Sequence, residues 1–162
     1  MCGIVGYVGP ADSVPIVFEG LHRLEYRGYD SAGVGVVANG TIKVHKDKGT
    51  VQAVESGLPK RLHGSPGIGH TRWATHGEPS QANAHPHVDS SGRVAVVHNG
   101  IVENAGELRA KLEADGIEFT SQTDSEVLAH LIAATEAETF EESVRRALLA
   151  VEGTYGLAVV DA

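Results

Sequence analysis

Apolar residues recur at helical spacing in several stretches of the chain. One stretch begins at the N-cap signal Asp12-Ser13 and should end as a helix near Tyr26-Arg27. The same spacing predicts helices over residues 107–114 and 139–151, and a helix that opens at residues 124–126. A weaker helix is expected over residues 52–63, which Gly57 and Pro59 interrupt.

Other stretches are short and apolar, as in buried strands. They lie at residues 2–9, 32–38, 41–45, 67–73, 94–98 and 154–161, and residues 117–120 are also predicted to be extended. Asn39-Gly40 joins two of these strands and is a strong type I′ hairpin signal. Hairpins mixed with helices predict an α+β layered fold rather than a repeated βαβ array.

Residues 74–92 are rich in Gly, Pro, Ser and Asn and form a long irregular segment. Such segments inside compact domains are usually functional or disordered. The last predicted strand runs to the chain end, so we expect a domain that has been cut at its C-terminal side.

Composition limits the class of protein. The length suits one domain, and apolar and charged contents of 41% and 21% are ordinary for a globular protein. A formal net charge of −8 without a basic stripe argues against nucleic acid or an anionic membrane as a partner. One cysteine excludes an internal disulfide and, with no secretion signal, favours the reducing cytoplasm.

The only cysteine, Cys2, would become the N-terminal residue if Met1 were removed. A thiol and a free α-amine would then share one Cα, with ordinary pKa values of about 8.5 and 7.7–8.0. This is a compact pairing of nucleophile and base. The alternative is a small residue buried in the first strand.

The stretch His70 to Gly77 places Arg72 and Trp73 at a strand-to-loop junction. A guanidinium is suited to holding a carboxylate with two hydrogen bonds. The alternative is a surface arginine beside a packed tryptophan.

Asn99-Gly100 follows the strand at 94–98 and also has two interpretations. The dipeptide by itself favours a hairpin turn. Alternatively, the Asn99 amide and the Gly100 N–H are two donors directed at one oxyanion.

Asp124 stands at the start of a predicted helix. It is either an N-cap that accepts from the helix backbone, or a carboxylate at a pocket edge that pairs with a ligand ammonium.

Nine histidines raise the possibility of a metal site, with His85 and His87 on one side of an extended segment and His70, His76 and His98 as further candidates. The spacings match no recognised ligand motif, so we predict no metal.

Taken together, the motifs resemble a known family. MCGIVGYVG, LEYRGYDSAG, GHTRWATHGEPS, NAHPH, HNGIVEN and TDSEVLAH occur in the order and at the spacing of the class II glutamine amidotransferases, which are N-terminal-nucleophile hydrolases. LEYRGYDSAG and HTRWATHG resemble the branch formed by the glutamine–fructose-6-phosphate aminotransferases (isomerising). The resemblance implies a four-layer αββα sandwich of mostly antiparallel sheets.

The resemblance also implies catalytic roles. Cys2, freed of Met1, would attack the side-chain amide of glutamine, and its α-amine would move the proton to the departing ammonia. Asn99 and Gly100 would stabilise the oxyanion, and Arg27 matches an arginine that the family places near the nucleophile.

For the substrate, the resemblance implies that Arg72 holds the α-carboxylate and that Trp73, Thr75 and His76 shape that wall. Asp124 would pair with the α-ammonium. A free zwitterionic amino acid needs one fixed cation and one fixed anion, which these two residues supply.

We therefore expect residues 1–162 to be one glutamine amidotransferase type 2 domain without its isomerase domain, and without a cofactor. L-Glutamine is the expected substrate, and fructose 6-phosphate would bind only through the missing domain of a full-length homo-oligomer. The alternatives are a glutaminase domain of the amidophosphoribosyltransferase type and a fragment that binds glutamine without hydrolysing it.

Overall fold

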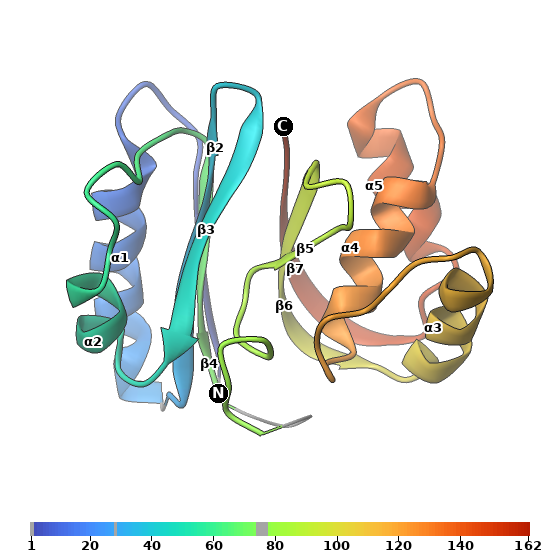
Figure 1. Cartoon of the computed structure of the whole chain (residues 1–162), viewed down its shortest axis with the longest axis horizontal. Helices are drawn as coiled ribbons and strands as arrows, with labels where there is room; N and C mark the ends of the chain where they lie inside the picture. Colours follow the sequence, from blue (N-terminus) through green and yellow to red (C-terminus); the bar gives the residue numbers. More distant parts are fainter. Residues whose placement is uncertain (1, 28, 74–77) are drawn as a thin grey trace.

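The computed structural model describes residues 2–27, 29–73 and 78–162, except for the side chain of Arg27. Two sheets face each other in the middle of the molecule, and each is covered on its outer side by helices (Figure 1). The order of layers is helix, sheet, sheet, helix. The α+β sandwich predicted from the sequence is confirmed.

The first half of the chain forms one sheet and its helical layer. Antiparallel strands β1 (Gly3–Tyr7), β2 (Ser31–Ala38), β3 (Thr41–Lys48) and β4 (Gly67–Arg72) lie in the order β1-β4-β2-β3. Helices α1 (Ser13–Leu24) and α2 (Val51–Ser56) cover it, and a short 3₁₀ helix, η1 (Glu25–Arg27), follows α1. Phe18, Leu21 and Val34 belong to the apolar core between these layers.

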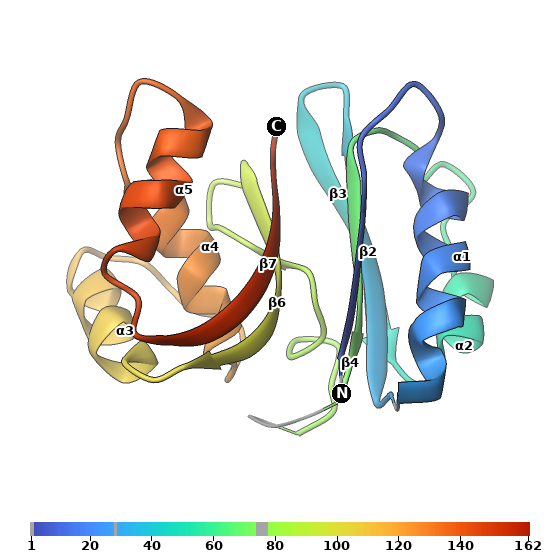
Figure 2. The same ribbon diagram turned by 180° about the vertical axis from the view of Figure 1, so that it is seen from behind.

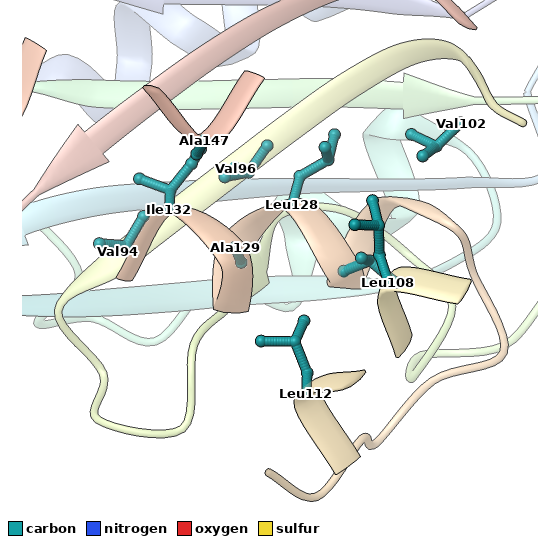
Figure 3. Close-up of a cluster of buried hydrophobic side chains, with 10 residues drawn as sticks. Val94, Val96, Val102, Leu108, Leu112, Leu128, Ala129, Ile132 and Ala147 are labelled. Carbon is teal, nitrogen blue, oxygen red and sulfur yellow. The ribbon is translucent and has the colours of Figure 1, made fainter. Parts of the chain in front are cut away.

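The second half forms the other two layers. Strands β5 (His87–Val88), β6 (Val94–Val102) and β7 (Gly153–Asp161) are antiparallel and lie in that order. Helices α3 (Ala105–Ala114), α4 (Ser125–Ala134) and α5 (Phe140–Leu148) cover them. Figure 3 shows Val96 of β6, Leu108 of α3, and Leu128 and Ile132 of α4 in the apolar cluster that joins these elements.

The two sheets contact each other through small and branched side chains. Ile68 of β4 packs with Ala95 and Val97 of β6 and Val160 of β7, and all four are buried. Figure 2 shows that β1 begins at one end of the sandwich and that β7 finishes at the opposite end. Gly3 at the start of β1 pairs with Thr71 near the end of β4, so the residues before β1 and at the end of β4 share one end of the molecule.

Local signals in the sequence explain several boundaries. The Asp12 carboxylate accepts from the Val14 N–H at the start of α1, as the N-cap signal predicted. Asn39 and Gly40 have φ of 54° and 69°, the backbone conformation that a type I′ turn requires, so the predicted hairpin is confirmed.

Two expectations about boundaries were wrong. The predicted helix over 52–63 is only α2, because Gly57 ends it and the chain does not resume helical structure before β4. The predicted strand at 94–98 continues to Val102, so Asn99-Gly100 lies inside β6 and is not a turn. Asn99 pairs with Gly156 of β7, which keeps the backbone extended there.

The irregular segment after β4 is held against the first sheet. Lys46 Nζ of β3 donates to the carbonyls of Ala84 at 2.7 Å and Pro86 at 3.0 Å, and burial lowers the Lys46 pKa to about 8. A Cβ at Gly33 of β2 would lie 2.2 Å from the His85 carbonyl, so only glycine permits this approach. The segment thereby carries buried histidines in between the two sheets.

Candidate active site

A cavity of about 700 Å³ opens at the end of the sandwich where β1 begins and β4 ends. Its lining comes from both sheets, from the residues before β1 and from the start of α4. The structure brings six predicted site residues to this cavity: Cys2, Arg72, Trp73, Asn99, Gly100 and Asp124. Three other predictions, the side chain of Arg27 together with Thr75 and His76, lie outside the described residues.

Cys2 is fixed at the cavity by backbone contacts. Its Sγ accepts from the Trp73 N–H at 3.2 Å and lies 3.6 Å from the Trp73 carbonyl oxygen. The next residue, Gly3, pairs with Thr71 of β4 and donates its N–H to Thr71 Oγ1. Cys2 is half-buried and lines the cavity, so the thiol is held where a ligand can reach it.

The Asn99 side chain lies directly beside Cys2. Its Nδ2 donates to the Cys2 carbonyl at 3.1 Å, and its Oδ1 lies 2.7 Å from His70 Nε2. One of the two Nδ2–H donors is therefore engaged by Cys2. The other remains for a ligand, since Asn99 lines the cavity.

Gly100 has a backbone conformation that side chains rarely adopt, with φ of 141°. A Cβ at this position would lie 2.0 Å from the Thr154 carbonyl oxygen of β7. That oxygen belongs to a paired strand and could move only if the pairing of β6 with β7 were disturbed. Glycine is therefore required here.

Arg72 is 4% exposed, so the interpretation as a surface arginine is wrong. Its Nη1 lies 3.7 Å from Asp30 Oδ1, and the Asp30 N–H donates to the Arg72 carbonyl at 2.8 Å. Trp73 is 54% exposed, so the interpretation as a packed tryptophan is also wrong. Arg72 and Trp73 both line the cavity.

Asp124 immediately precedes α4, but in the described structure its side chain makes no capping hydrogen bond to that helix. Its Oδ2 instead accepts from the Val102 N–H of β6 at 2.9 Å, and Oδ1 lies 3.4 Å from Ser125 Oγ. The capping interpretation is therefore wrong for the side chain. The half-buried carboxylate lines the cavity, and its four lone-pair sites exceed these two contacts.

Glu126, which the sequence did not single out, holds the segment before Asp124. Its two carboxylate oxygens accept from the N–H and hydroxyl of Thr120 and of Ser121, at 2.6–2.8 Å. Burial raises the Glu126 pKa, but the nearby His130, with Nε2 at 3.7 Å, and the hydrogen bonds from Ser121 and Thr120 outweigh it and hold the pKa well below its ordinary value. Arg109 donates to the carbonyls of Ser121 and Thr123. The N–H groups of this segment are therefore bound by Glu126, and its carbonyls are bound by Arg109.

Replacing Glu126 with glutamine should lower the free energy of unfolding by about 3 kcal/mol at pH 7, because the new NH₂ group faces donors in a site that is 1% exposed. A carboxylate with a lowered pKa stabilises the fold above its ordinary pKa, and this contribution is lost as the pH falls. In urea denaturation, the difference between wild type and Glu126→Gln should therefore shrink below about pH 4.5.

The exposed Glu107, which is paired with Lys111 on α3, is the matched control. Glu107→Gln should leave the free energy of unfolding almost unchanged. Equal destabilisation by the two variants, or a Glu126→Gln effect that is constant from pH 7 to pH 3, contradicts the prediction.

The buried histidines gather between the sheets. The His85 ring lies 4.2 Å from the His70 ring and 4.6 Å from the His87 ring, measured between centroids. Burial lowers the pKa of His85 and His87 well below the ordinary value, so both rings are neutral at neutral pH. Within residues 2–27, 29–73 and 78–162, no three histidine, cysteine or acidic side chains are placed to hold a metal ion.

His70, Glu126 and Asp30 are the residues around the site that sequence reasoning missed. His70 stands inside a motif that the sequence analysis quoted, but its partner Asn99 lies on the other sheet. Glu126 stands two residues after Asp124, in the first turn of α4. The His70 contact has no signal in the local sequence, because it joins residues of two sheets that meet only when the layers pack.

Known structures share this fold. A glutamine phosphoribosylpyrophosphate amidotransferase from B. subtilis superimposes with a TM-score of 0.84 at 30% identity, over 99% of this chain and 35% of that chain. The fold is therefore that of the N-terminal-nucleophile amidotransferases. A family model described as a glutamine amidotransferase domain matches residues 70–162, which is more than half of the chain. The chain belongs to the glutamine amidotransferase domain family.

Curated relatives are more similar in sequence. A glutamine–fructose-6-phosphate aminotransferase (isomerizing) from Symbiobacterium thermophilum is 55% identical over 99% of this chain. One from Thermus thermophilus is 52% identical over 98% of this chain. The chain spans about a quarter of the length of these relatives, 26% in both cases. No helix among the described residues is long and apolar enough to cross a membrane.

Proposed function

We propose that this chain hydrolyses L-glutamine to glutamate and ammonia through a thioester on Cys2. Cys2 Sγ forms a bond to the side-chain amide carbon of glutamine, and the carbon–nitrogen bond of that amide breaks. The α-amine, free once Met1 is removed, carries the thiol proton to the departing nitrogen. Water then cleaves the thioester, which releases glutamate and returns a proton to the sulfur.

The remaining site residues would stabilise charge. Asn99 Nδ2–H and the Gly100 N–H would donate to the oxyanion that develops on the amide oxygen. Arg72 would hold the substrate α-carboxylate and Asp124 its α-ammonium. Fixed opposite charges at the two sides of one cavity select a free amino acid over a protein side chain, because a peptide-bonded glutamine has neither charge.

For the remaining predictions at the site, Trp73, Thr75 and His76 would shape the wall beside Arg72, and Arg27 would act near the nucleophile. These four roles rest on the sequence motifs. No metal or cofactor is part of the proposed chemistry, since each step uses groups that the chain itself supplies.

One observation carries the proposal above all: Cys2, Asn99, Arg72 and Asp124 all line the same cavity of about 700 Å³. These are the nucleophile, oxyanion donor, cation and anion that glutamine hydrolysis needs, and they come from distant parts of the chain.

Intact mass spectrometry before and after a chloroketone analogue of L-glutamine tests the proposal. We expect a mass without Met1 and one covalent adduct, which L-glutamine should slow. The Cys2→Ala variant is the control and should gain no adduct. A folded protein without Met1 that gains no adduct from the analogue contradicts the proposal.

We further propose that residues 1–162 act as the glutaminase domain of a larger cytoplasmic, homo-oligomeric enzyme. In that enzyme the ammonia would aminate fructose 6-phosphate to give glucosamine 6-phosphate. The support is the 50–55% identity to relatives named glutamine–fructose-6-phosphate aminotransferase (isomerizing). In the complete protein, fructose 6-phosphate should be consumed together with glutamine.

The second candidate is a glutaminase of the phosphoribosylpyrophosphate amidotransferase type. The TM-score of 0.84 to that enzyme favours it, but the identity of 30% is lower. Consumption of phosphoribosyl pyrophosphate instead of fructose 6-phosphate by the complete protein would identify this second type.

A further inference from the structure

The amide of Asn99 is held from two sides by groups that belong to the opposite sheet or directly precede it. Nδ2 donates to the Cys2 carbonyl at 3.1 Å, and Oδ1 lies 2.7 Å from Nε2 of His70. His70 is on β4 of the four-stranded sheet, and Asn99 is on β6 of the three-stranded sheet. This hydrogen bond therefore crosses the interface between the sheets, next to the proposed nucleophile.

The chemistry of the three groups determines which atom donates. The Cys2 carbonyl can only accept, so the Asn99 NH₂ group must face it. Asn99 Oδ1 then faces His70, and because this oxygen can only accept, Nε2 of His70 must carry the proton. The orientation of the amide and the tautomer of the imidazole are thus two parts of one arrangement.

The surroundings of His70 support the same tautomer. The ring is 1% exposed, and burial lowers the His70 pKa to about 4, although the hydrogen bond to Asn99 opposes this shift. The imidazole is therefore neutral at neutral pH and has a single N–H. Among the described residues, Nδ1 has no hydrogen-bond partner, so the one proton is used at Nε2.

A reversed Asn99 amide would place its oxygen against the Cys2 carbonyl oxygen, and it would aim no donor at the substrate. Two acceptors in contact repel each other, and an Nε2–H without an acceptor would be left buried. His70 and the Cys2 carbonyl therefore select the same orientation. In that orientation, the second Asn99 N–H, which does not bond to the Cys2 carbonyl, is the one that can donate to a ligand in the cavity.

We propose that His70 is a positioning residue, whose Nε2–H orients the Asn99 amide so that its N–H faces the reacting carbonyl of glutamine. This inference rests on the proposed function, in which Asn99 donates to the oxyanion. The competing explanation is packing, because the His70 ring also contacts the His85 ring at 4.2 Å. The experiment must therefore distinguish loss of the Nε2–H hydrogen bond from loss of ring packing.

Two amide substitutions make that separation. In His70→Gln the side-chain nitrogen is four bonds from Cα, as Nε2 of histidine is, so the donor to Asn99 is kept and the ring is lost. In His70→Asn the amide is one methylene shorter and falls short of Asn99. Both variants replace the ring with a neutral amide, and they differ in reach.

We expect His70→Asn to lower kcat for glutamine hydrolysis by at least about tenfold, with a limit set by the roughly 100- to 1,000-fold cost of losing the oxyanion donor itself. KM should change little, because the oxyanion exists only in the transition state. His70→Gln should keep most of the wild-type kcat. Alkylation of Cys2 by iodoacetamide, which forms no oxyanion, should proceed at the wild-type rate in both variants.

His45 provides the control, since it lies on β3, its Nε2 is 2.8 Å from the Val54 carbonyl oxygen, and it does not line the cavity. His45→Leu should leave kcat near the wild-type value. In addition, His70→Asn combined with Asn99→Ala should lose no more activity than Asn99→Ala, because the two residues act through one amide.

Several outcomes would overturn the inference. Wild-type kcat in His70→Asn, equal losses in His70→Gln and His70→Asn, or additive losses with Asn99→Ala would each do so while leaving the proposed function standing. Full activity in Asn99→Ala would remove the oxyanion role and this inference together. A wild-type protein that releases no glutamate would overturn the proposed function itself.

A second measurement needs no variant that could fail to fold. The ¹⁵N shifts of the His70 ring in the wild-type protein should report a proton on Nε2 and a bare Nδ1 from pH 8 down to about pH 5. A proton on Nδ1 would overturn the inference, because Nε2 could then only accept, as Asn99 Oδ1 does.

Discussion

Cys2→Ala should abolish glutamate release from L-glutamine while L-glutamine binding remains. Removing a nucleophile that forms a covalent intermediate costs on the order of 10⁴-fold or more in kcat. The groups proposed to bind the substrate charges, Arg72 and Asp124, are separate from the thiol and stay in place. Glutamate release followed over time, with calorimetry of L-glutamine binding to the variant, measures both parts.

The α-amine can be tested separately from the thiol. A short N-terminal extension that the cell does not remove would convert the amine of Cys2 into an amide and eliminate the base. Hydrolysis should be lost, whereas the thiol should still react with iodoacetamide. Substantial glutamate release by Cys2→Ala would contradict the proposed mechanism. Wild-type protein without Met1 that binds glutamine and releases no glutamate would point instead to a binding module.

Asp124→Asn should raise KM for L-glutamine by about 100-fold, because the substrate ammonium would lose a charged partner in a partly desolvated cavity. The asparagine keeps an oxygen that can accept from the Val102 N–H, so the start of α4 should stay in place. The variant therefore removes the charge and preserves the shape.

Glutaramate, which is glutamine without its α-ammonium group, provides the control substrate. Wild-type protein should prefer L-glutamine to glutaramate by about 100-fold in kcat/KM, and Asp124→Asn should lose most of that preference. Steady-state kinetics with both substrates and both proteins give the four kcat/KM values that this comparison needs. An unchanged preference in Asp124→Asn would show that another group recognises the ammonium.

The site forms only when the two halves of the chain pack together. Cys2 and Arg72 belong to the first sheet and the strand ends next to it, whereas Asn99, Gly100 and Asp124 belong to β6 and to the start of α4. The His70–Asn99 bond and the apolar contacts of Ile68 with Val97 join these halves. Loss of sheet packing would therefore separate Cys2 from Asn99 and Gly100.

Two identical dipeptides show the limit of local sequence reasoning. Asn39-Gly40 forms the predicted turn, with positive φ at both residues. Asn99-Gly100 continues a strand instead, because β7 pairs along it and the Gly100 backbone adopts a φ of 141° beside the Thr154 carbonyl. The dipeptide permits both outcomes, and the neighbouring strand decides between them.

The same holds for charged residues. Arg72 and Asp124 looked from their local context like a surface arginine and a helix cap, and both of those interpretations were wrong. What indicated otherwise was the order of several motifs along the whole chain. That order predicted which residues would meet, but not the contacts that orient them.

By itself, the sequence determined the layered α+β architecture, the hairpin at Asn39-Gly40 and the cap at Asp12, and it predicted the pairing of a thiol with an α-amine at Cys2. These follow from periodicity, backbone preferences and covalent neighbours, which are local properties. Only the tertiary structure decided that Asn99 lies inside a strand and that His70 holds its amide. The physical reason is that a hydrogen bond depends on distance and direction in space, and these partners come together only when strands and helices pack.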